Sequence, residues 1–367
     1  MGTTWSQMWP PTPTLTEKNL PSQTGKVFLI TGGASGIGLA LAHILYAAGD
    51  RVYIVGRSEA NGSTAISSIQ DAFLNLNLSD LSTIAPAVAA FQAKENHLHV
   101  LFNNAGVSLA PLGSTSAQSE ELMMATNCLG PYLLTQLLLP SLVTAAQDPA
   151  TPPHSVRVVW TSSIAVDTQA PVGGLDPADL APAPTPAGAG SEEQQLGWYL
   201  KQSQQIKYAV SKLGNWYHAA ALARQVGKQG VLSVTQNPGN LTTNLTQHMP
   251  RLVVLTVRPL LYESRYGAYT ALWAGLSGEL GEGDQGAYVV PWGRRHPQLR
   301  GNLVEACKSV EEGGKGRADG FAGGRSKRDV FAAGNKTYSV SQLPPNDRIP
   351  GINNSEPTPT SLKSLRS

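Results

Sequence analysis

The sequence predicts a doubly wound α/β domain, in which helices cover both faces of a mostly parallel sheet. Three observations indicate this fold. Lys26–Thr31 is a short apolar, β-branched run of the kind that forms a fully buried parallel strand. Residues 36–49 then place apolar side chains at helical spacing and end in glycine. A second apolar run, Arg51–Arg57, follows at once, so strand, helix and strand form one βαβ unit.

The turn between the first strand and the helix is rich in glycine and reads TGGASGIG from Thr31 to Gly38. Glycine has no Cβ, so it permits a tight turn and lets a diphosphate lie against backbone N–H groups at the positive end of a helix. No Gly-Lys-Ser/Thr follows, which excludes a Walker A loop. Sugar-nucleotide epimerases would need glycine at Ser35. The turn therefore predicts a dinucleotide-binding site.

Tyr208 and Lys212 stand four residues apart in YAVSK. If this stretch is helical, both side chains lie on one face, and the ammonium can reach the phenol oxygen. A free tyrosine has a pKa near 10. A nearby positive charge would lower that pKa by favouring the ionised form. Taken alone, the pair is better interpreted as an ordinary surface pair on a long helix; the glycine turn and the other motifs reverse that preference.

Further motifs follow the expected strands. Ser163 ends an apolar run in WTSS, at the carboxyl edge where doubly wound sheets bind ligands, and its hydroxyl could donate to a substrate carbonyl. Ser162 is the alternative. The other motifs are NNAG at 103–106, Asn127 in TNCLG and NPGNLTT at 237–243.

In these motifs and their order, residues 24–295 resemble the short-chain dehydrogenase/reductase family. Within the family, the chain is most similar to the fungal retinol-dehydrogenase-like members. These members have a similar Pro-rich leader and a PWGR segment, which is Pro291–Arg294 here. The resemblance implies a single Rossmann domain with a mostly parallel seven-stranded sheet. It favours Ser163 over Ser162 as the active serine. It also implies that Asn127 holds a proton-relay water, although a helix-interior asparagine would fit the sequence equally well.

The residues expected to bind the cofactor come from the glycine turn, the strand ends and the catalytic helix. Asn77 stands where the family commonly has an adenine-binding Asp, and its amide oxygen can still accept a hydrogen bond. Thr243 matches the family threonine near the carboxamide, with Thr242 as a competitor. The expected set is Gly32, Ser35, Gly36, Ile37, Gly38, Arg57, Asn77, Asn104, Ala105, Gly106, Tyr208, Lys212, Pro238, Gly239 and Thr243.

The end of the second strand predicts which nicotinamide is used. NAD enzymes usually place Asp or Glu there for the ribose hydroxyls, whereas this chain has Gly56, Arg57 and Ser58. A missing carboxylate removes repulsion of a 2′-phosphate, and a guanidinium can bind it in a charge-assisted fork. NADP(H) is therefore the predicted cofactor; the alternative is that Arg57 is an ordinary solvated arginine.

Composition limits the partners. The net charge of +2 gives no reason to expect nucleic acid, and the H-x-H pair His97 and His99 has no further ligand cluster, so no metal is expected. Two distant cysteines fit a reducing compartment. The leader has no apolar core for a signal or anchor, so a cytoplasmic protein without stable membrane insertion is expected. The apolar stretch Leu129–Ala146 is interrupted by proline and predicts a buried helix, which could also serve as a homodimer interface.

Three parts are expected along the chain: a Pro-rich leader at 1–23, the catalytic Rossmann domain at 24–312, and a disordered tail at 313–367 rich in Gly, Ser, Pro and charge. An Ala/Pro-rich insertion at about 173–197 joins two catalytic elements. It is either a mobile lid or a passive surface insertion. Met249–Tyr262 should supply apolar pocket walls, which predicts an apolar substrate.

Together these features predict an NADP(H)-dependent oxidoreductase that interconverts a carbonyl and an alcohol on a small or medium apolar molecule, with a tailoring step in secondary metabolism suggested by the resemblance. Its catalytic residues would be Asn127, Ser163, Tyr208 and Lys212. The alternative is a non-catalytic NADP(H)-binding scaffold or redox sensor of the same fold. A degraded catalytic set would favour that alternative, whereas the set here is complete.

Overall fold

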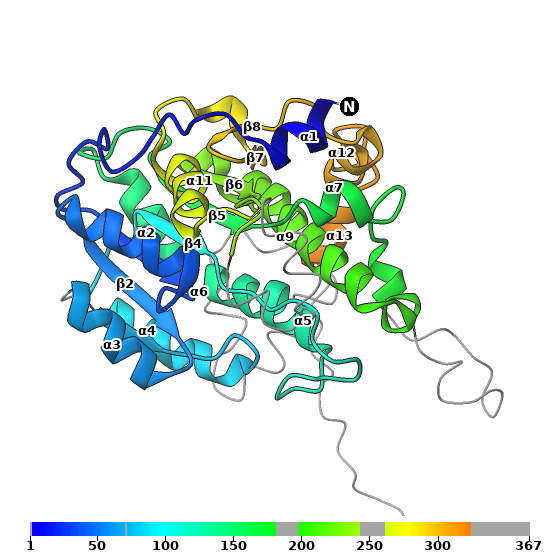
Figure 1. The fold of residues 1–367 in the computed structure, drawn as a ribbon, viewed down its shortest axis with the longest axis horizontal. Coiled ribbons are helices and arrows are strands. Elements are labelled where there is room, and N and C mark those ends of the chain that lie inside the picture. The colour runs from blue at the N-terminus through cyan, green and yellow to red at the C-terminus, as the bar shows by residue number, and fades with distance from the viewer. Residues whose placement is uncertain (1, 70–71, 181–196, 243–260, 324–367) are drawn as a thin grey trace, which may run out of the picture. The chain divides into compact units, whose positions relative to one another are not determined.

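A single mixed sheet organises the protein (Figure 1). The computed structural model describes residues 2–69, 72–180, 197–242 and 261–323, all within the first of two compact units, residues 1–336. The strand order is β3-β2-β1-β4-β5-β6-β7-β8, and every pair is parallel except β7 with β8. The strands are β1 (Val27–Thr31), β2 (Arg51–Gly56), β3 (Ala72–Asn75), β4 (Val100–Asn103), β5 (Val156–Thr161), β6 (Val231–Gln236), β7 (Tyr288–Val290) and β8 (Arg294–Arg295).

The α/β prediction is confirmed, and the expected seven strands become eight in the described part of the chain. The added strand, β8, has only two residues and turns back antiparallel against β7. The central strands β1, β5 and β6 are buried along their whole length. Continuous apolar runs suit strands covered on both faces, which is why the simple hydrophobic pattern located them.

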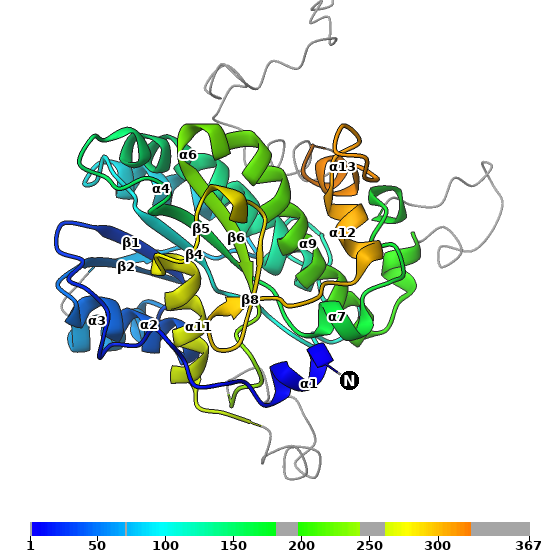
Figure 2. The same cartoon turned by 90° about the horizontal axis from the view of Figure 1, so that it is seen from above.

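Helices cover both faces of this sheet (Figure 2). One face carries α2 and α11, whose apolar residues form a core with Phe28, Ile30 and Val234. The other carries α4, α6 and α9, which pack around Leu29, Leu101 and Val158. The helices are α1 (Gly2–Met8), α2 (Gly36–Ala47), α3 (Glu59–Ile69), α4 (Ile84–Gln92), α5 (Leu122–Met124), α6 (Gly130–Gln147), α7 (Ala165–Gln169), α9 (Gln204–Val226), α11 (Ser264–Leu276), α12 (Gly301–Cys307) and α13 (Arg317–Gly323).

The apolar stretch at Leu129–Ala146 forms most of α6. Within the described residues, Leu122–Gln147 is long and apolar enough to cross a membrane, but 78% of its most apolar window is buried inside the protein. A helix that is apolar on every side belongs either in a membrane or in a core. Its burial identifies it here as a core helix.

The expectation of a disordered tail from Gly313 is wrong for its first residues. Residues 317–323 form α13, which packs on α9 with Phe321 2% exposed. Phe321 lies edge-on to Tyr217 and beside His218. The glycine-rich sequence hid this helix, because its order depends on a partner helix about a hundred residues away rather than on local propensity. Residues 324–367 lie outside the described part.

The insertion at 173–197 is described only at its two ends. Two 3₁₀ turns, Pro177–Leu180 and Trp198–Lys201, frame residues 181–196, which lie outside the described residues. Leu175, Leu180 and Tyr199 are buried, so both ends belong to the core. The choice between a lid and a passive insertion stays a prediction.

Candidate active site

The glycine turn lies between the end of β1 and the start of α2. Gly32 and Gly36 have φ of +67° and +55°, a region that residues with a Cβ rarely adopt. A Cβ on Gly38 would lie 2.5 Å from the carbonyl oxygen of Gly32, so the helix can begin this close to the turn only with glycine. A Cβ on Gly36 would meet open space in the described structure.

Ser35 precedes α2 as its N-cap but makes no side-chain capping bond among the described residues. The first N–H groups of this helix are therefore left for another acceptor. Together with the space at Gly36, this arrangement fits the diphosphate of a dinucleotide. Ile37 follows in the first turn of α2 and lies against Gly267 of α11, so the start of α2 packs on α11.

Thr31 joins the glycine turn to the loop after β4. Its hydroxyl accepts hydrogen bonds from the backbone N–H of Asn104 (2.9 Å) and Ala105 (3.0 Å). The Asn104 amide returns a bond to the Thr31 carbonyl at 2.9 Å. These bonds hold Asn104 and Ala105 against Gly32 as one wall of the predicted cofactor site. The function of the Thr31 side chain was not predicted. Its position at the end of a strand was the only feature of the sequence that could have indicated it.

Tyr208, Ser163 and Lys212 come together at the carboxyl edge of the sheet. Tyr208 and Lys212 lie on α9, and the Lys212 ammonium is 5.8 Å from the centre of the Tyr208 ring. Ser163 follows β5, and its side chain lies beside the Tyr208 phenol. Burial raises the pKa of Tyr208, and the nearby Ser163 hydroxyl opposes that rise. The expected lowering by Lys212 is therefore wrong for the protein alone, because Lys212 directs its ammonium elsewhere.

The Lys212 ammonium donates a hydrogen bond to the carbonyl of Thr161, at the end of β5, with an N···O distance of 3.0 Å. Lys212 is almost completely buried, and burial lowers its pKa to about 8. A Cβ on Gly106 would lie 3.0 Å from both the Lys212 nitrogen and the Asn127 amide oxygen. Gly106 therefore leaves the room in which these two polar groups meet.

Asn127 lies in a π-helical turn, Ala125–Leu129, that leads into α6. Such turns widen a helix and often occur at functional sites. The Asn127 amide accepts from the N–H of Val107 (2.8 Å) and donates to the carbonyl of Val107 and the hydroxyl of Ser211 (both 2.9 Å). Its side chain thus braces the NNAG loop against α9. Its role in holding a water stays a prediction.

The two neighbouring serines have different surroundings. The Ser162 hydroxyl is buried, donates to the Lys212 carbonyl (2.8 Å) and accepts from the Tyr288 hydroxyl (2.9 Å). Ser163 instead faces Tyr208. This geometry favours Ser163 as the group that meets a substrate and gives Ser162 a bracing function. Tyr288 was not predicted, because nothing local in the sequence connects β7 to these serines.

The NPG loop continues from β6. Gly239 has φ of +92°, and its N–H donates to the Asn237 side-chain oxygen at 3.1 Å. A Cβ on Gly239 would lie 2.6 Å from the Trp292 ring, so only glycine fits between Pro238 and the PWGR segment. Thr242 bonds through its backbone N–H to Tyr262. Thr243 lies outside the described residues.

Two predicted adenosine-side residues lie at the ends of β2 and β3. Arg57 is exposed, and no ion pair or hydrogen bond to another side chain is found for it in the described ranges. The Asn77 amide oxygen already accepts from the N–H and hydroxyl of Ser79, at 3.2 and 2.8 Å. Asn77 therefore shapes its own loop, and both lone pairs of its amide oxygen are used there, so accepting from an adenine amino group would mean replacing one of these bonds.

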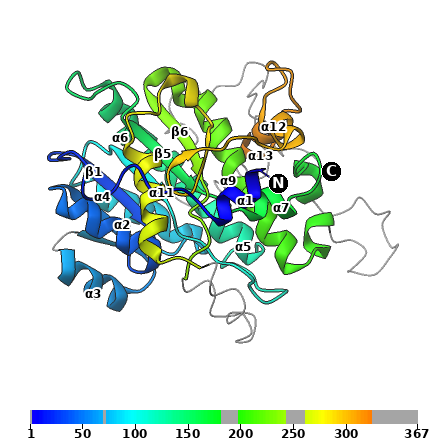
Figure 3. The same cartoon turned by 45° about the horizontal axis from the view of Figure 1, so that its top comes forward.

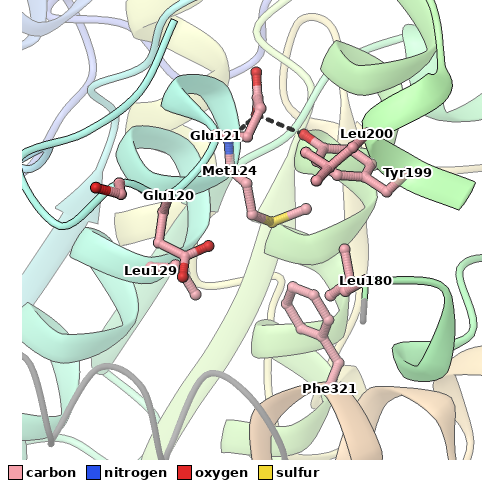
Figure 4. Close-up of a pocket in the computed structure, with 9 residues that line it drawn as sticks. Glu120, Glu121, Met124, Leu129, Leu180, Tyr199, Leu200 and Phe321 are labelled. Atoms are coloured by element: carbon pink, nitrogen blue, oxygen red, sulfur yellow. Dashed lines mark hydrogen bonds between the residues drawn. The ribbon is translucent and has the colours of Figure 1, made fainter. Parts of the chain in front are cut away.

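A separate small pocket lies outside this site (Figure 4). It has a volume of about 70 Å³, and its lining includes Glu121, Met124, Tyr199 and Phe321. The Tyr199 hydroxyl donates to the Glu121 carboxylate at 2.7 Å. None of the predicted catalytic side chains lines it, and ligand pockets are usually at least about 300 Å³. We therefore place the candidate site at the strand ends.

Comparisons with known proteins agree with this geometry. A family model described as short chain dehydrogenase matches residues 26–174. The short-chain dehydrogenase/reductase iacJ of Pestalotiopsis fici is 40% identical over 333 residues, covering 87% of this chain and 95% of that protein. The short-chain dehydrogenase/reductase pkfC of Emericella nidulans is 39% identical over 294 residues, covering 77% and 88%.

A solved structure, the Pseudomonas aeruginosa RhlG/NADP active-site complex, has a TM-score of 0.53 and 23% identity, covering 71% of this chain and 94% of that one. This likeness shows the fold alone. The fungal matches go further, because they cover most of this chain at 39–40% identity. The chain belongs to the short-chain dehydrogenase/reductase family.

Proposed function

We propose that this oxidoreductase is NADP(H)-dependent and interconverts a carbonyl and an alcohol on a small or medium apolar substrate. The observation that carries the proposal is the cluster of Tyr208, Ser163 and Lys212, in which the Lys212 ammonium is 5.8 Å from the centre of the Tyr208 ring. It lies at the carboxyl edge of the sheet, where Lys212 is also held by the end of β5. Ligands of doubly wound sheets bind at this edge.

The chain's own residues account for the acid–base part of the reaction. A bound nicotinamide supplies the hydride in reduction and accepts it in oxidation. Ser163 donates a hydrogen bond to the substrate oxygen as negative charge develops there. Burial raises the pKa of Tyr208, so its phenol stays protonated at neutral pH and can donate a proton to that oxygen in reduction. Lys212 and Asn127, whose polar atoms both lie beside Gly106, would form the route by which the proton is replaced.

The preference for NADP(H) over NAD(H) rests on Arg57. This exposed guanidinium follows β2 directly, at a strand end without a carboxylate. Its fork geometry suits a phosphate monoester. The Asn77 loop and the Thr31–Asn104 bonds would then shape the adenosine side of the site.

Aromatic rings beside the NPG loop support an apolar substrate. The Trp292 ring lies against Gly239 and contacts both Tyr262 and Tyr266, with ring centres 4.9 and 5.2 Å apart. Of the predicted walls at 249–262, only Leu261 and Tyr262 are described. The similar fungal proteins are in keeping with a tailoring step in secondary metabolism. The likeness to retinol dehydrogenases stays a prediction. Two buried free cysteines support a reducing, cytoplasmic location. A homodimer stays a prediction that light scattering can test.

The test uses purified protein with NADPH or NADH and a panel of apolar ketones and quinones. We expect turnover with NADPH and a loss of about a thousandfold in kcat for Tyr208→Phe, because the proton donor is removed. Tyr46→Phe, which changes a partly exposed tyrosine on α2, is the matched control and should keep full activity. Equal turnover by the Tyr208 variant would overturn the mechanism. NADPH binding without turnover of any substrate would favour a scaffold.

A further inference from the structure

The N-terminal helix α1 lies against the loops that follow β5, β6 and β7 (Figures 1 and 3). Its residue Gln7 is 1% exposed. The Gln7 side-chain nitrogen donates to the Asp167 carboxylate at 2.8 Å, and the Gln7 side-chain oxygen accepts from the Asn237 amide at 2.8 Å. The His296 ring nitrogen lies 3.5 Å from the same Gln7 nitrogen and 2.8 Å from the carboxylate. One glutamine therefore joins three loops that are far apart in the sequence.

Neighbouring residues of α1 strengthen the same contact. The Arg294 guanidinium donates to the carbonyl of Ser6. The Met8 carbonyl accepts from the Tyr262 hydroxyl at 3.3 Å, and the Asn240 amide lies 2.7 Å from the Met8 sulfur. The Pro-rich leader is thus bonded to the NPG loop and to the PWGR segment.

The bond from Gln7 to Asn237 has a direct consequence for the NPG loop. Asn237 uses its amide nitrogen for Gln7 and its amide oxygen for the N–H of Gly239. Holding the nitrogen in place also fixes which way the oxygen points, since both belong to one planar group. Gln7 therefore orients the residue that shapes the turn at Pro238 and Gly239.

Only a side chain with both a donor and an acceptor satisfies these two partners. Leucine would leave the Asn237 amide without its buried partner, and Asp167 with only His296. Glutamate has the same shape, but its charge would repel Asp167 as long as His296, which lies beside both positions, is neutral. Protonation at lower pH would return a donor to that position.

We infer that Gln7 is a positioning residue of the active site: through Asn237 and Asp167 it holds the NPG loop and α7 in the geometry that binds the nicotinamide end of the cofactor. Helix α1 is accordingly part of the catalytic unit. The inference rests on the proposed function, because it takes the NPG loop to be a cofactor contact.

The test measures NADPH affinity directly, by fluorescence titration without substrate, and the KM for NADPH separately. Gln7→Leu and Gln7→Glu should each weaken binding about tenfold at pH 8, as expected for a lost buried hydrogen bond. For Gln7→Glu, part of the loss should be recovered near pH 5.5. Thr4→Ala, an exposed change on the same helix, is the control and should bind as the wild type does.

The outcomes separate the two claims. If the wild type does not bind NADPH, the proposed function fails. If the wild type binds and both Gln7 variants bind equally well, the positioning role is overturned. If Gln7→Leu does not fold, Gln7→Glu decides through its pH dependence: recovery of affinity at low pH supports the role, and an affinity that is weak and independent of pH contradicts it.

Discussion

The two ends of the sheet use their polar groups differently. At the amino end, the buried Arg157 guanidinium donates to the carbonyls of Ala274 (3.1 Å) and Ser277 (2.7 Å), near the end of α11. The His99 ring accepts from the N–H of Val27 at 3.0 Å. At the carboxyl end, the start of α2 lacks a side-chain cap and Arg57 is exposed. Polar groups that form hydrogen bonds within the protein stabilise the fold, whereas polar groups without such bonds are available to a ligand.

A choice of site by cavity volume alone would place the site at the amino end of the sheet. A groove of about 600 Å³ lies at the amino end and is lined by Lys26, Glu95, His97 and His99 among others. Burial lowers the pKa of His99 to about 4, so this ring is neutral at physiological pH and serves as an acceptor. No group of three or more potential metal ligands occurs in the described part of the chain. The comparison teaches that partners, rather than volume, distinguish a site from a surface hollow.

The strongest test of this contrast is Arg157→Met, which keeps the length of the side chain and removes its donors. We expect the free energy of unfolding to fall by about 3 kcal/mol, because several buried carbonyls lose a charged partner. The kcat of the folded protein should stay unchanged. Denaturant unfolding and steady-state assays measure the two effects. Lys94→Met is the control: this exposed lysine lies just after α4, and its loss should cost under about 0.5 kcal/mol. Lost activity with unchanged stability would give the amino end a catalytic role.

The second test concerns α9, whose other face carries a buried histidine. The His218 ring stacks on Tyr132 and Phe321, with ring centres 4.7 and 4.9 Å apart, and neither ring nitrogen has a hydrogen-bond partner in the described structure. Burial lowers the pKa of His218 from 6.5 to about 3. The unfolded chain therefore binds an extra proton between these values, and stability falls as the pH falls.

Because of His218, we expect the free energy of unfolding to fall by about 2 kcal/mol as the pH falls from roughly 7 to 5. His218→Phe should abolish that part of the slope in urea unfolding measured at both pH values. His97→Phe, at a half-exposed position, should leave the slope intact. An identical slope in the wild type and the His218 variant would mean that the ring is not held neutral.

The smallest expected effect is at the carboxyl end. Arg57→Ala should raise the KM for NADPH about tenfold, because a charge-assisted bond to the 2′-phosphate is lost. The KM for NADH and the unfolding free energy should not change. Lys94→Ala removes an exposed positive charge just after α4 and controls for net charge. A wild-type preference for NADH would contradict the role of Arg57.

The parts of this structure that depend on local sequence were predictable. Apolar runs located the central strands, and the glycine turn located the start of α2, since both follow from side-chain periodicity and backbone freedom. The pairing of Tyr208 with Lys212 on one helix followed from their spacing. The direction of the Lys212 ammonium did not, because its acceptor is the Thr161 carbonyl on another element.

The features that were missed depend on contacts between distant residues. The burial of Gln7 depends on partners 160 and 230 positions away, and a seven-residue polar helix carries no hydrophobic periodicity. The different functions of Ser162 and Ser163 depend on Tyr288, which belongs to a strand formed much later in the chain. No window of the sequence contains these partners together.

Because α13 packs on α9, the packing of α9 can be completed only after α13 has been synthesised. The Phe321 ring lies where a side chain on Gly214 would be, against the helix that carries Tyr208 and Lys212. Chains grow from the N-terminus, and domains generally fold as units while they are being made. The ribosome must therefore deliver residue 321 before α9 acquires its full set of neighbours. A nascent chain halted earlier would expose the aromatic surface of Tyr217 and His218 to chaperones.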